Sequence, residues 1–345
     1  MKIGNKLMKI PVIQGGMGIG VSAGRLSGSV AACGGAGTIS AVGIGYRQVD
    51  HFKAFLESNL RAMEEEFQKA RNLSQDGIVG FNIMTVITDY VTYVKKAVSL
   101  KADFIVSGAG LPLELPKFVK GTDTQAVPIV SSGKAAKIIL KTWKKKWEYI
   151  PQLIIIEGPE AGGHLGFKAS YFEKEEKESL KDLLDSVRAA VAPFQEQVKE
   201  KIQLVVAGGI VTPEDVKAAL DLGADGVQMG TRFIATEECD ADPRYKQKYV
   251  EATDEDVMII QSPVGLPGRA LKNPFTVEGA KGRIRCRNCL TPCNPSTTIY
   301  CIADALERAV RGDVDGGLLF TGSQVGKIHS MKSVKEIFQE IEAVL

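Results

Sequence analysis

Eight short apolar runs, rich in β-branched residues, constrain the fold of this chain more than any other feature. They span residues 11–14, 37–40, 78–83, 103–107, 127–131, 153–157, 204–207 and 226–229. Segments with a helical pattern separate them, and most neighbouring runs start about 21 to 26 residues apart. This alternation predicts parallel strands that are joined by helical crossovers.

Eight strand and helix units favour a closed (β/α)8 TIM barrel of the α/β class, and no G-x-G-x-x-G motif follows the first run. A count of seven or nine strands would reopen the choice between this barrel and an open doubly wound sheet. We expect the barrel to span residues 1–238. Residues 239–345 are expected to form a C-terminal extension of a loop, a cysteine-rich segment and helices near 298–311 and 334–344 that pack on the barrel. Thr212 and Pro213 indicate a helix start after the seventh strand.

Charge and hydropathy exclude several classes of protein. The chain has 43 Lys and Arg against 41 Asp and Glu, so a net charge of +2 argues against a nucleic-acid-binding protein. Its longest apolar runs fall far short of the roughly 20 residues that cross a bilayer. The N-terminus has no apolar signal region, so we expect a cytoplasmic protein without membrane contact. The oligomeric state stays open, and a homo-oligomer is one alternative.

Glycine is abundant, with 36 of 345 residues, and many of the glycines directly follow the predicted strands. They include Gly15, Gly16 and Gly18 after the first strand, Gly158, Gly162, Gly163 and Gly166 after the sixth, Gly208 and Gly209 after the seventh, and Gly230 after the eighth. Barrel enzymes often bind phosphate after strands seven and eight, where glycine lets the backbone approach a ligand. The pattern favours a phosphate-containing ligand, although tight turns would also use glycine.

His164 lies in EGPEAGGHLG after the sixth predicted strand, so we expect it on a flexible, water-accessible loop at the mouth of the barrel. A histidine there can transfer a proton near neutral pH, and a structural histidine is the alternative. His51 and His329 are expected at the surface.

Four of the six cysteines, Cys286, Cys289, Cys293 and Cys301, have the spacing C-x2-C-x3-C-x7-C. They could bind Zn²⁺ or an iron–sulfur cluster, or be reduced structural thiols.

The segments PVIQGGMG, GFNIM, SGAG, EGPEAGGHLG, AGGI, GADGVQMGTRF, GRALKN and GDVDGG occur in this order between residues 11 and 326. The ordered set resembles the FMN-dependent nitronate monooxygenases, formerly called 2-nitropropane dioxygenases, and their relatives, the flavin-type enoyl-acyl-carrier-protein reductases. The resemblance implies a barrel with FMN at the carboxyl ends of the strands and His164 as the catalytic residue. The cofactor-binding residues that it implies, together with adjacent glycines, are Gly15, Gly16, Met17, Asn82, Glu157, Gly162, Gly163, Gly208, Gly209, Gln228, Met229, Gly230 and Thr231.

The first hypothesis is therefore an FMN-dependent nitronate monooxygenase, an oxidoreductase that oxidises small alkyl nitronates or nitroalkanes with O2. The alternative enzyme is an enoyl-thioester reductase with NAD(P)H as co-substrate. A flavin-binding sensor with a metal at the cysteine cluster is the alternative outside enzymes. The cysteine segment is not part of the reductase pattern.

Overall fold

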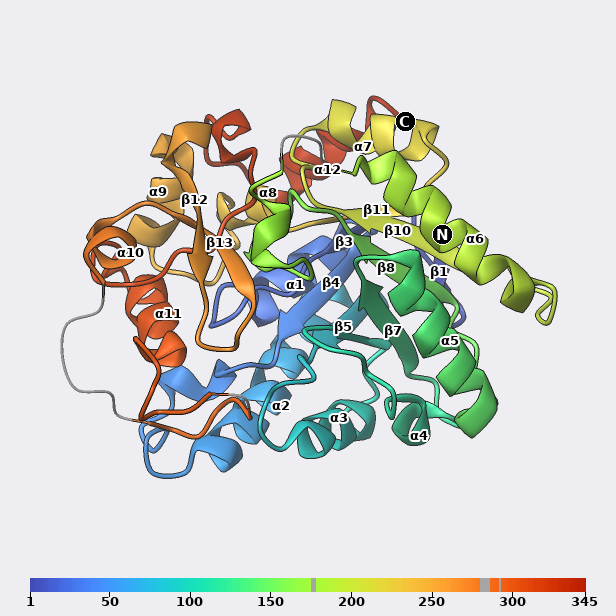
Figure 1. Cartoon of the computed structure of the whole chain (residues 1–345), viewed down its shortest axis with the longest axis horizontal. Coiled ribbons are helices and arrows are strands. Elements are labelled where there is room, and N and C mark those ends of the chain that lie inside the picture. The colour runs from blue at the N-terminus through green and yellow to red at the C-terminus, as the bar shows by residue number, and fades with distance from the viewer. Residues whose placement is uncertain (175–177, 280–285, 292) are drawn as a thin grey trace.

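Eight parallel strands close into a barrel, as the sequence predicted (Figure 1). The computed structural model describes residues 1–174, 178–279, 286–291 and 293–345. The barrel strands are β3 (Val12–Gln14), β4 (Ala36–Ser40), β5 (Ile78–Asn82), β6 (Phe104–Ser107), β7 (Gln125–Val130), β8 (Leu153–Glu157), β10 (Gln203–Ala207) and β11 (Gly226–Met229). They pair in the order β3-β4-β5-β6-β7-β8-β10-β11, and β11 pairs with β3 to close the ring. All eight predicted strands are confirmed.

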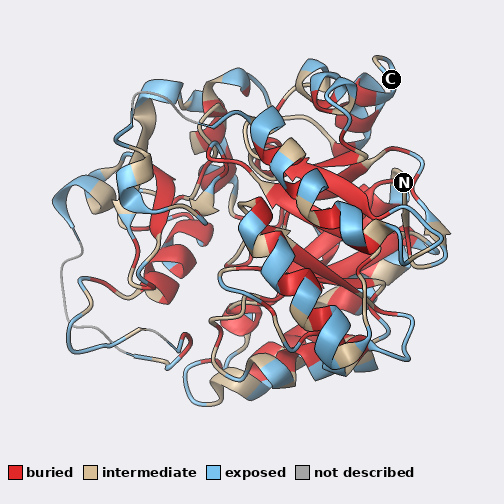
Figure 2. Ribbon diagram, turned by 45° about the vertical axis from the view of Figure 1, so that its right-hand side comes forward, coloured by how far each residue is buried: buried red, intermediate tan, exposed pale blue. Residues whose placement is uncertain are grey.

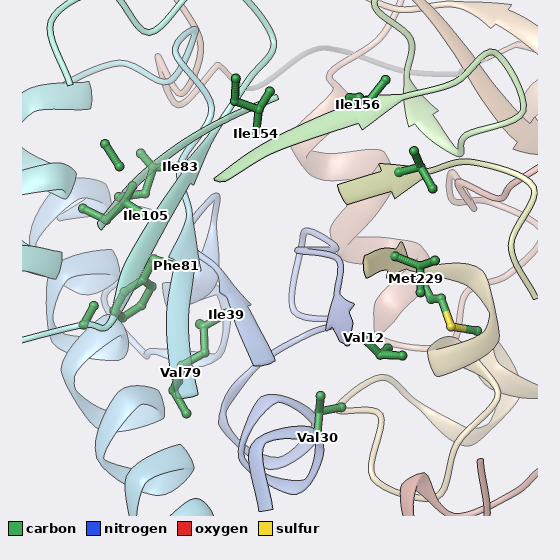
Figure 3. Close-up of a cluster of buried hydrophobic side chains, with 14 of the residues drawn as sticks. Val12, Val30, Ile39, Val79, Phe81, Ile83, Ile105, Ile154, Ile156 and Met229 are labelled. Atoms are coloured by element: carbon green, nitrogen blue, oxygen red, sulfur yellow. The ribbon is translucent and has the colours of Figure 1, made fainter. Parts of the chain in front are cut away.

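Helices surround the strands and bury one apolar face each (Figure 2). They are α1 (Gly24–Ala32), α2 (Phe55–Ser74), α3 (Tyr90–Ser99), α4 (Pro116–Val119), α5 (Gly133–Trp147), α6 (Leu180–Gln195) and α7 (Pro213–Asp221), with the short helices η1 (Ile44–Arg47) and η2 (Ala169–Tyr171) in connecting segments. Alternate strand residues such as Val79, Phe81 and Ile156 point outward into this layer (Figure 3). At the start of α7, the backbone N–H of Asp215 donates to Oγ1 of Thr212, which confirms the predicted cap.

The ring of helices is completed by α12 (Val334–Glu342), which packs against α1 and α7. Val334, Ile337 and Phe338 belong to the hydrophobic core that lies between the strands and their helices. Residues between β11 and α12 therefore form an insertion that begins with the short helix α8 (Thr231–Ile234). The division at residues 238 and 239 stays a prediction, but the final helix contributes to the barrel.

An N-terminal hairpin of β1 (Lys2–Ile3) and β2 (Lys6–Leu7) lies at the amino ends of the barrel strands. Ile3 and Met8 pack with the inward-facing residues Phe104 and Leu153 in the barrel interior. This hairpin was not predicted, because its strands are two residues long. It closes the barrel at the end away from the glycine-rich loops.

The insertion contains a hairpin where the sequence predicted a loop. Its elements are α9 (Pro243–Glu251), η3 (Asp254–Asp256), β12 (Val257–Gln261), β13 (Pro267–Leu271), α10 (Pro274–Glu278), α11 (Ile302–Val310) and η4 (Val325–Lys327). Strand β13 pairs with β12 and also with β9 (Gly163–His164), so the insertion is joined directly to the loop after β8. No helix in the described part of the chain is long and apolar enough to span a membrane.

Candidate functional site

A cavity of about 480 Å³ lies where the strands end and the insertion covers the barrel. Its size falls in the range of roughly 300–1,000 Å³ that is usual for small-molecule and cofactor sites. His164 lines it, as do twelve of the thirteen predicted cofactor residues: Gly15, Gly16, Met17, Asn82, Glu157, Gly162, Gly163, Gly208, Gly209, Gln228, Gly230 and Thr231. Residues from the ends of five separate strands thus meet at one site.

Met229 is the exception, since it does not line the cavity, and its part in cofactor binding stays a prediction. Successive side chains of a strand point to opposite faces, so Gln228 faces the cavity while Met229 points into the helix layer (Figure 3). Met229 is 1% exposed. Its carbonyl accepts a hydrogen bond from the N–H of Gly15 at 2.8 Å, so its contribution is to hold the first glycine loop.

Three glycines shape the cavity with backbone conformations that other residues rarely adopt. Gly208 and Gly209 have φ values of +99° and +74°, in the left-handed region that favours glycine. A Cβ on Gly208 would lie 2.9 Å from the backbone nitrogen of Ala161. Gly163 has a φ of +74°, and a Cβ there would meet nothing within 4 Å, so its open side faces free space. These positions leave bare backbone along the cavity.

Two buried amide oxygens at the cavity have no hydrogen-bond partner among the described residues. They are Oε1 of Gln228 and Oε1 of Gln324, and both residues line the cavity. A buried polar atom without a partner costs free energy, about 1–3 kcal/mol. Each oxygen can accept a hydrogen bond, so the site is chemically suited to a ligand with hydroxyl or N–H donors.

His164 is held in β9 rather than on the flexible loop that the sequence predicted. Strand β13 pairs His164 with Gly268, and Nε2 of His164 lies 2.7 Å from Oγ of Ser262 in the β12–β13 turn. The ring of Phe320 packs edge-on against the imidazole, with the ring centroids 5.1 Å apart. Burial lowers the pKa of His164 to about 4. The imidazole is therefore neutral at pH 7 and can accept a proton.

Glu157 ends β8 and lines the same cavity as His164. Burial raises its pKa to about 7, although the backbone N–H of Gly166 and the charge of Arg269 act in the opposite direction. Arg269 is 7% exposed, and Nη1 of its guanidinium donates to the carbonyl of Ala161. Glu157 is therefore a carboxyl group that changes charge near neutral pH inside the site.

The insertion supplies site residues that the sequence did not predict. Ser262 orients His164, and Tyr245 of α9 reaches the cavity with its hydroxyl 2.9 Å from that of Tyr249. Cys289, Leu290, Ile302, Ala303 and Leu306 add an apolar surface. Local pattern gave no signal for these contacts, because each depends on how the insertion folds over the barrel.

The predicted metal site at the four clustered cysteines finds no support in the structure. All four are free thiols, with Cys286 exposed, Cys289 buried, and Cys293 and Cys301 half-buried. Burial raises the pKa of Cys289 to about 12, the opposite of what a metal ligand requires. Within the described residues, no group of three or more His, Cys, Asp or Glu side chains could hold a metal ion.

His51 was expected at the surface, and that prediction was wrong. It is 1% exposed, with Nδ1 at 3.1 Å from Oγ of Ser58 and Nε2 at 3.1 Å from Oε1 of Glu307. Arg287, in the cysteine segment, donates from Nη1 to the same Glu307 carboxylate and lies 4.2 Å above the ring of Phe52. His51, Arg287 and Glu307 form a buried cluster outside the cavity, which we call the Arg287 cluster. His329 is exposed, as predicted.

Comparison with known proteins supports the resemblance. A probable nitronate monooxygenase of Bacillus subtilis (strain 168) is 32% identical over 126 residues, which cover 36% of this chain and 33% of that protein. The alignments cover only 29 to 33% of the length of the first three curated relatives.

Two solved structures have the same fold. FabK from Thermotoga maritima is 27% identical with a TM-score of 0.73, covering 98% of this chain and 93% of that one. A nitroalkane oxidase from Streptomyces ansochromogenes is 21% identical with a TM-score of 0.70, covering 98% and 96%. The sequence model of the nitronate monooxygenase family matches residues 1–343. Since this match spans nearly the whole chain, the protein belongs to the nitronate monooxygenase family.

Proposed function

We propose that this protein is an FMN-dependent oxidoreductase that oxidises alkyl nitronates or nitroalkanes with O2. The observation that carries the proposal is the position of His164. A neutral imidazole, fixed by β13 and Ser262, lines the same cavity as the bare backbone of Gly208 and Gly209. One cavity thus combines a proton acceptor with a surface that suits a phosphate-containing cofactor.

The residues present fit FMN. The partnerless Oε1 of Gln228 suits a ribityl hydroxyl, and the open backbone at Gly208 and Gly209 suits the phosphate. Gly163, with free space beside its α-carbon, leaves room for a flat ring, and Gly16 lets the first glycine loop pack directly against Asn82. Bound FMN would supply the electron-transfer chemistry between substrate and oxygen.

His164 would then act on the substrate's α-carbon proton. A nitroalkane must lose this proton to become a nitronate. Burial keeps the imidazole of His164 neutral at pH 7, so a ring nitrogen is unprotonated and available to accept the proton. Ser262 holds Nε2 at 2.7 Å and so fixes the plane of the ring. Phe320 packs against the ring edge and limits its movement.

Replacement of His164 tests the proposal. We expect His164→Ala to retain bound FMN, measured by its visible absorbance, and to lose a hundredfold or more in kcat/KM for O2 consumption with a neutral nitroalkane. With a preformed nitronate, which needs no proton removal, the same variant should lose less of its kcat/KM. His329→Ala, an exposed histidine, is the matched control. Unchanged oxidation of the nitroalkane by His164→Ala would contradict the assignment.

The second candidate is reduction of an enoyl thioester with NAD(P)H, which the likeness to FabK favours. It uses the same cavity, so a direct assay separates the two. NAD(P)H-dependent reduction of a crotonyl thioester, without O2 consumption on any nitronate, would replace the first candidate by the second.

A further inference from the structure

A short segment of the insertion, residues 321–324, is bonded to two barrel loops that line the cavity. The N–H of Gly322 donates to Oγ1 of Thr231, after β11, at 2.9 Å. The N–H of Ser323 donates to the carbonyl of Glu160, after β8, at 3.1 Å. Because Thr231 and Glu160 both line the cavity, the insertion is fixed at the end of the cavity where these two loops meet.

A pair of side chains, Glu160 and Gln324, closes the same end. Nε2 of Gln324 donates to Oε2 of Glu160 at 2.6 Å. Both side chains pack on Gly209, where a Cβ would overlap Oε2 of Glu160 and would lie 3.2 Å from Nε2 of Gln324. Both residues line the cavity, and Glu160 is also exposed to solvent. The Glu160–Gln324 pair therefore separates the cavity from solvent by a single layer of side chains.

The backbone inside this pair offers hydrogen-bond donors to one phosphate group. The pair covers the α-carbon of Gly209, but the N–H groups of Gly208 and Gly209 have no acceptor among the described residues. Successive free backbone N–H groups suit the oxygens of an anion. The carboxylate of Glu160 stands at the outer side, and its side chain bonds to the neutral amide of Gln324 and to no cation in the described part of the chain. A second phosphate would meet this negative charge instead of further donors.

We propose that the Glu160–Gln324 pair determines which flavin the site accepts, because it ends the site after one phosphate and excludes FAD. The second phosphate and the adenosine of FAD would have to pass the pair to reach solvent. The inference rests on the proposed function, which places the cofactor phosphate at Gly208 and Gly209. Shape and charge act together, since the two side chains block the path and the carboxylate repels the pyrophosphate.

Two substitutions separate shape from charge. Gln324→Ala shortens one side chain and breaks its hydrogen bond to Glu160, which opens the single layer to solvent. Glu160→Gln removes the charge with little change in shape. Gln247→Ala is the matched control, because Gln247 of α9 makes the same kind of hydrogen bond to Glu251 and neither of these residues is among those that line the cavity.

Flavin binding to the full-length apoprotein tests the proposal. We would measure Kd for riboflavin, FMN and FAD by calorimetry at low and at high salt. The wild type should bind FMN about a hundredfold more tightly than FAD. Gln324→Ala should tighten FAD binding about tenfold or more and change the Kd of FMN less than about threefold. Glu160→Gln should tighten FAD binding about three- to fivefold at low salt and less at high salt, because salt screens the repulsion.

Riboflavin and the control variant show whether these effects are specific. Riboflavin has no phosphate, so it should bind equally well to every variant, which also shows that each variant is folded. Gln247→Ala should leave all three affinities unchanged. Equal affinity of the wild type for FMN and FAD, or unchanged FAD affinity in both Gln324→Ala and Glu160→Gln, would overturn the proposal. If the flavins bind as expected but nitroalkanes are not oxidised, the proposed activity fails while the role of this pair stands.

Discussion

The carboxyl group of Glu157 should make the stability of the apoprotein depend on pH. Burial raises its pKa from the ordinary value of 4.5 to about 7, so the folded state favours the protonated form. The folded state therefore binds the proton more tightly than the unfolded state. The contribution of Glu157 to the stability of the folded state is fully present below pH 4.5 and is lost as the pH rises to about 7.

The magnitude follows from the two pKa values. Each pH unit between them corresponds to about 1.4 kcal/mol, so the full loss is about 3 kcal/mol. Glu157 faces the cavity and keeps some contact with water, which reduces the penalty. We expect a loss of about 1–3 kcal/mol in the free energy of unfolding between pH 5 and pH 8.

Urea unfolding of the apoprotein at pH 5 and pH 8 measures this effect. Glu157→Gln keeps the shape of the side chain and removes its titration, so the variant should lack about 1–3 kcal/mol of the pH dependence of the wild type. Glu160→Gln makes the same chemical change at an exposed carboxylate of the same loop and should behave like the wild type. The same pH dependence in Glu157→Gln and the wild type would refute the reasoning.

Three further substitutions test the packing that supports the site. Glu307→Ala leaves the buried Arg287 without its carboxylate and should lower the free energy of unfolding by about 3–5 kcal/mol in urea; a loss below about 1 kcal/mol would show that the pair is not buried. Thr212→Ala removes the cap of α7 and should cost about 1 kcal/mol in the same assay, whereas no change would argue against the capping box. Gly208→Ala should lower FMN content after purification more than Gly121→Ala, since both glycines have positive φ but only Gly208 lines the cavity.

The sequence predicted the barrel because its signal is local. Each strand, such as β8 (Leu153–Glu157), is a continuous apolar run, and Thr212 followed by Pro213 marks a helix start without distant contacts. The glycines after the strands were found for the same reason. The alternation of side chains along β11 also places Gln228 and Met229 on opposite faces, so the orientation of Met229 could have been predicted from the sequence.

The missed features depend on contacts between distant residues. His51 reads as polar and therefore exposed, and only its pairing with Glu307, 256 residues away, explains its burial. Ser262 meets His164 across 98 residues, through pairing of β9 with β13. Neither contact leaves a periodic pattern in the sequence. The prediction from local pattern therefore placed His51 at the surface and His164 on a flexible loop.

These long-range contacts explain why the insertion matters for chemistry. The barrel strands place the glycines, but they do not hold His164, whose backbone pairs with Gly268 and whose Nε2 contacts Ser262. The insertion also contributes apolar side chains to the cavity lining, among them Leu290 and Leu306. The barrel thus provides the surface suited to a cofactor, while the insertion positions the proposed proton acceptor and covers the cavity. Changes in substrate preference among proteins with this barrel should therefore arise in the insertion, since it can vary without altering the strand ends that form the cofactor surface.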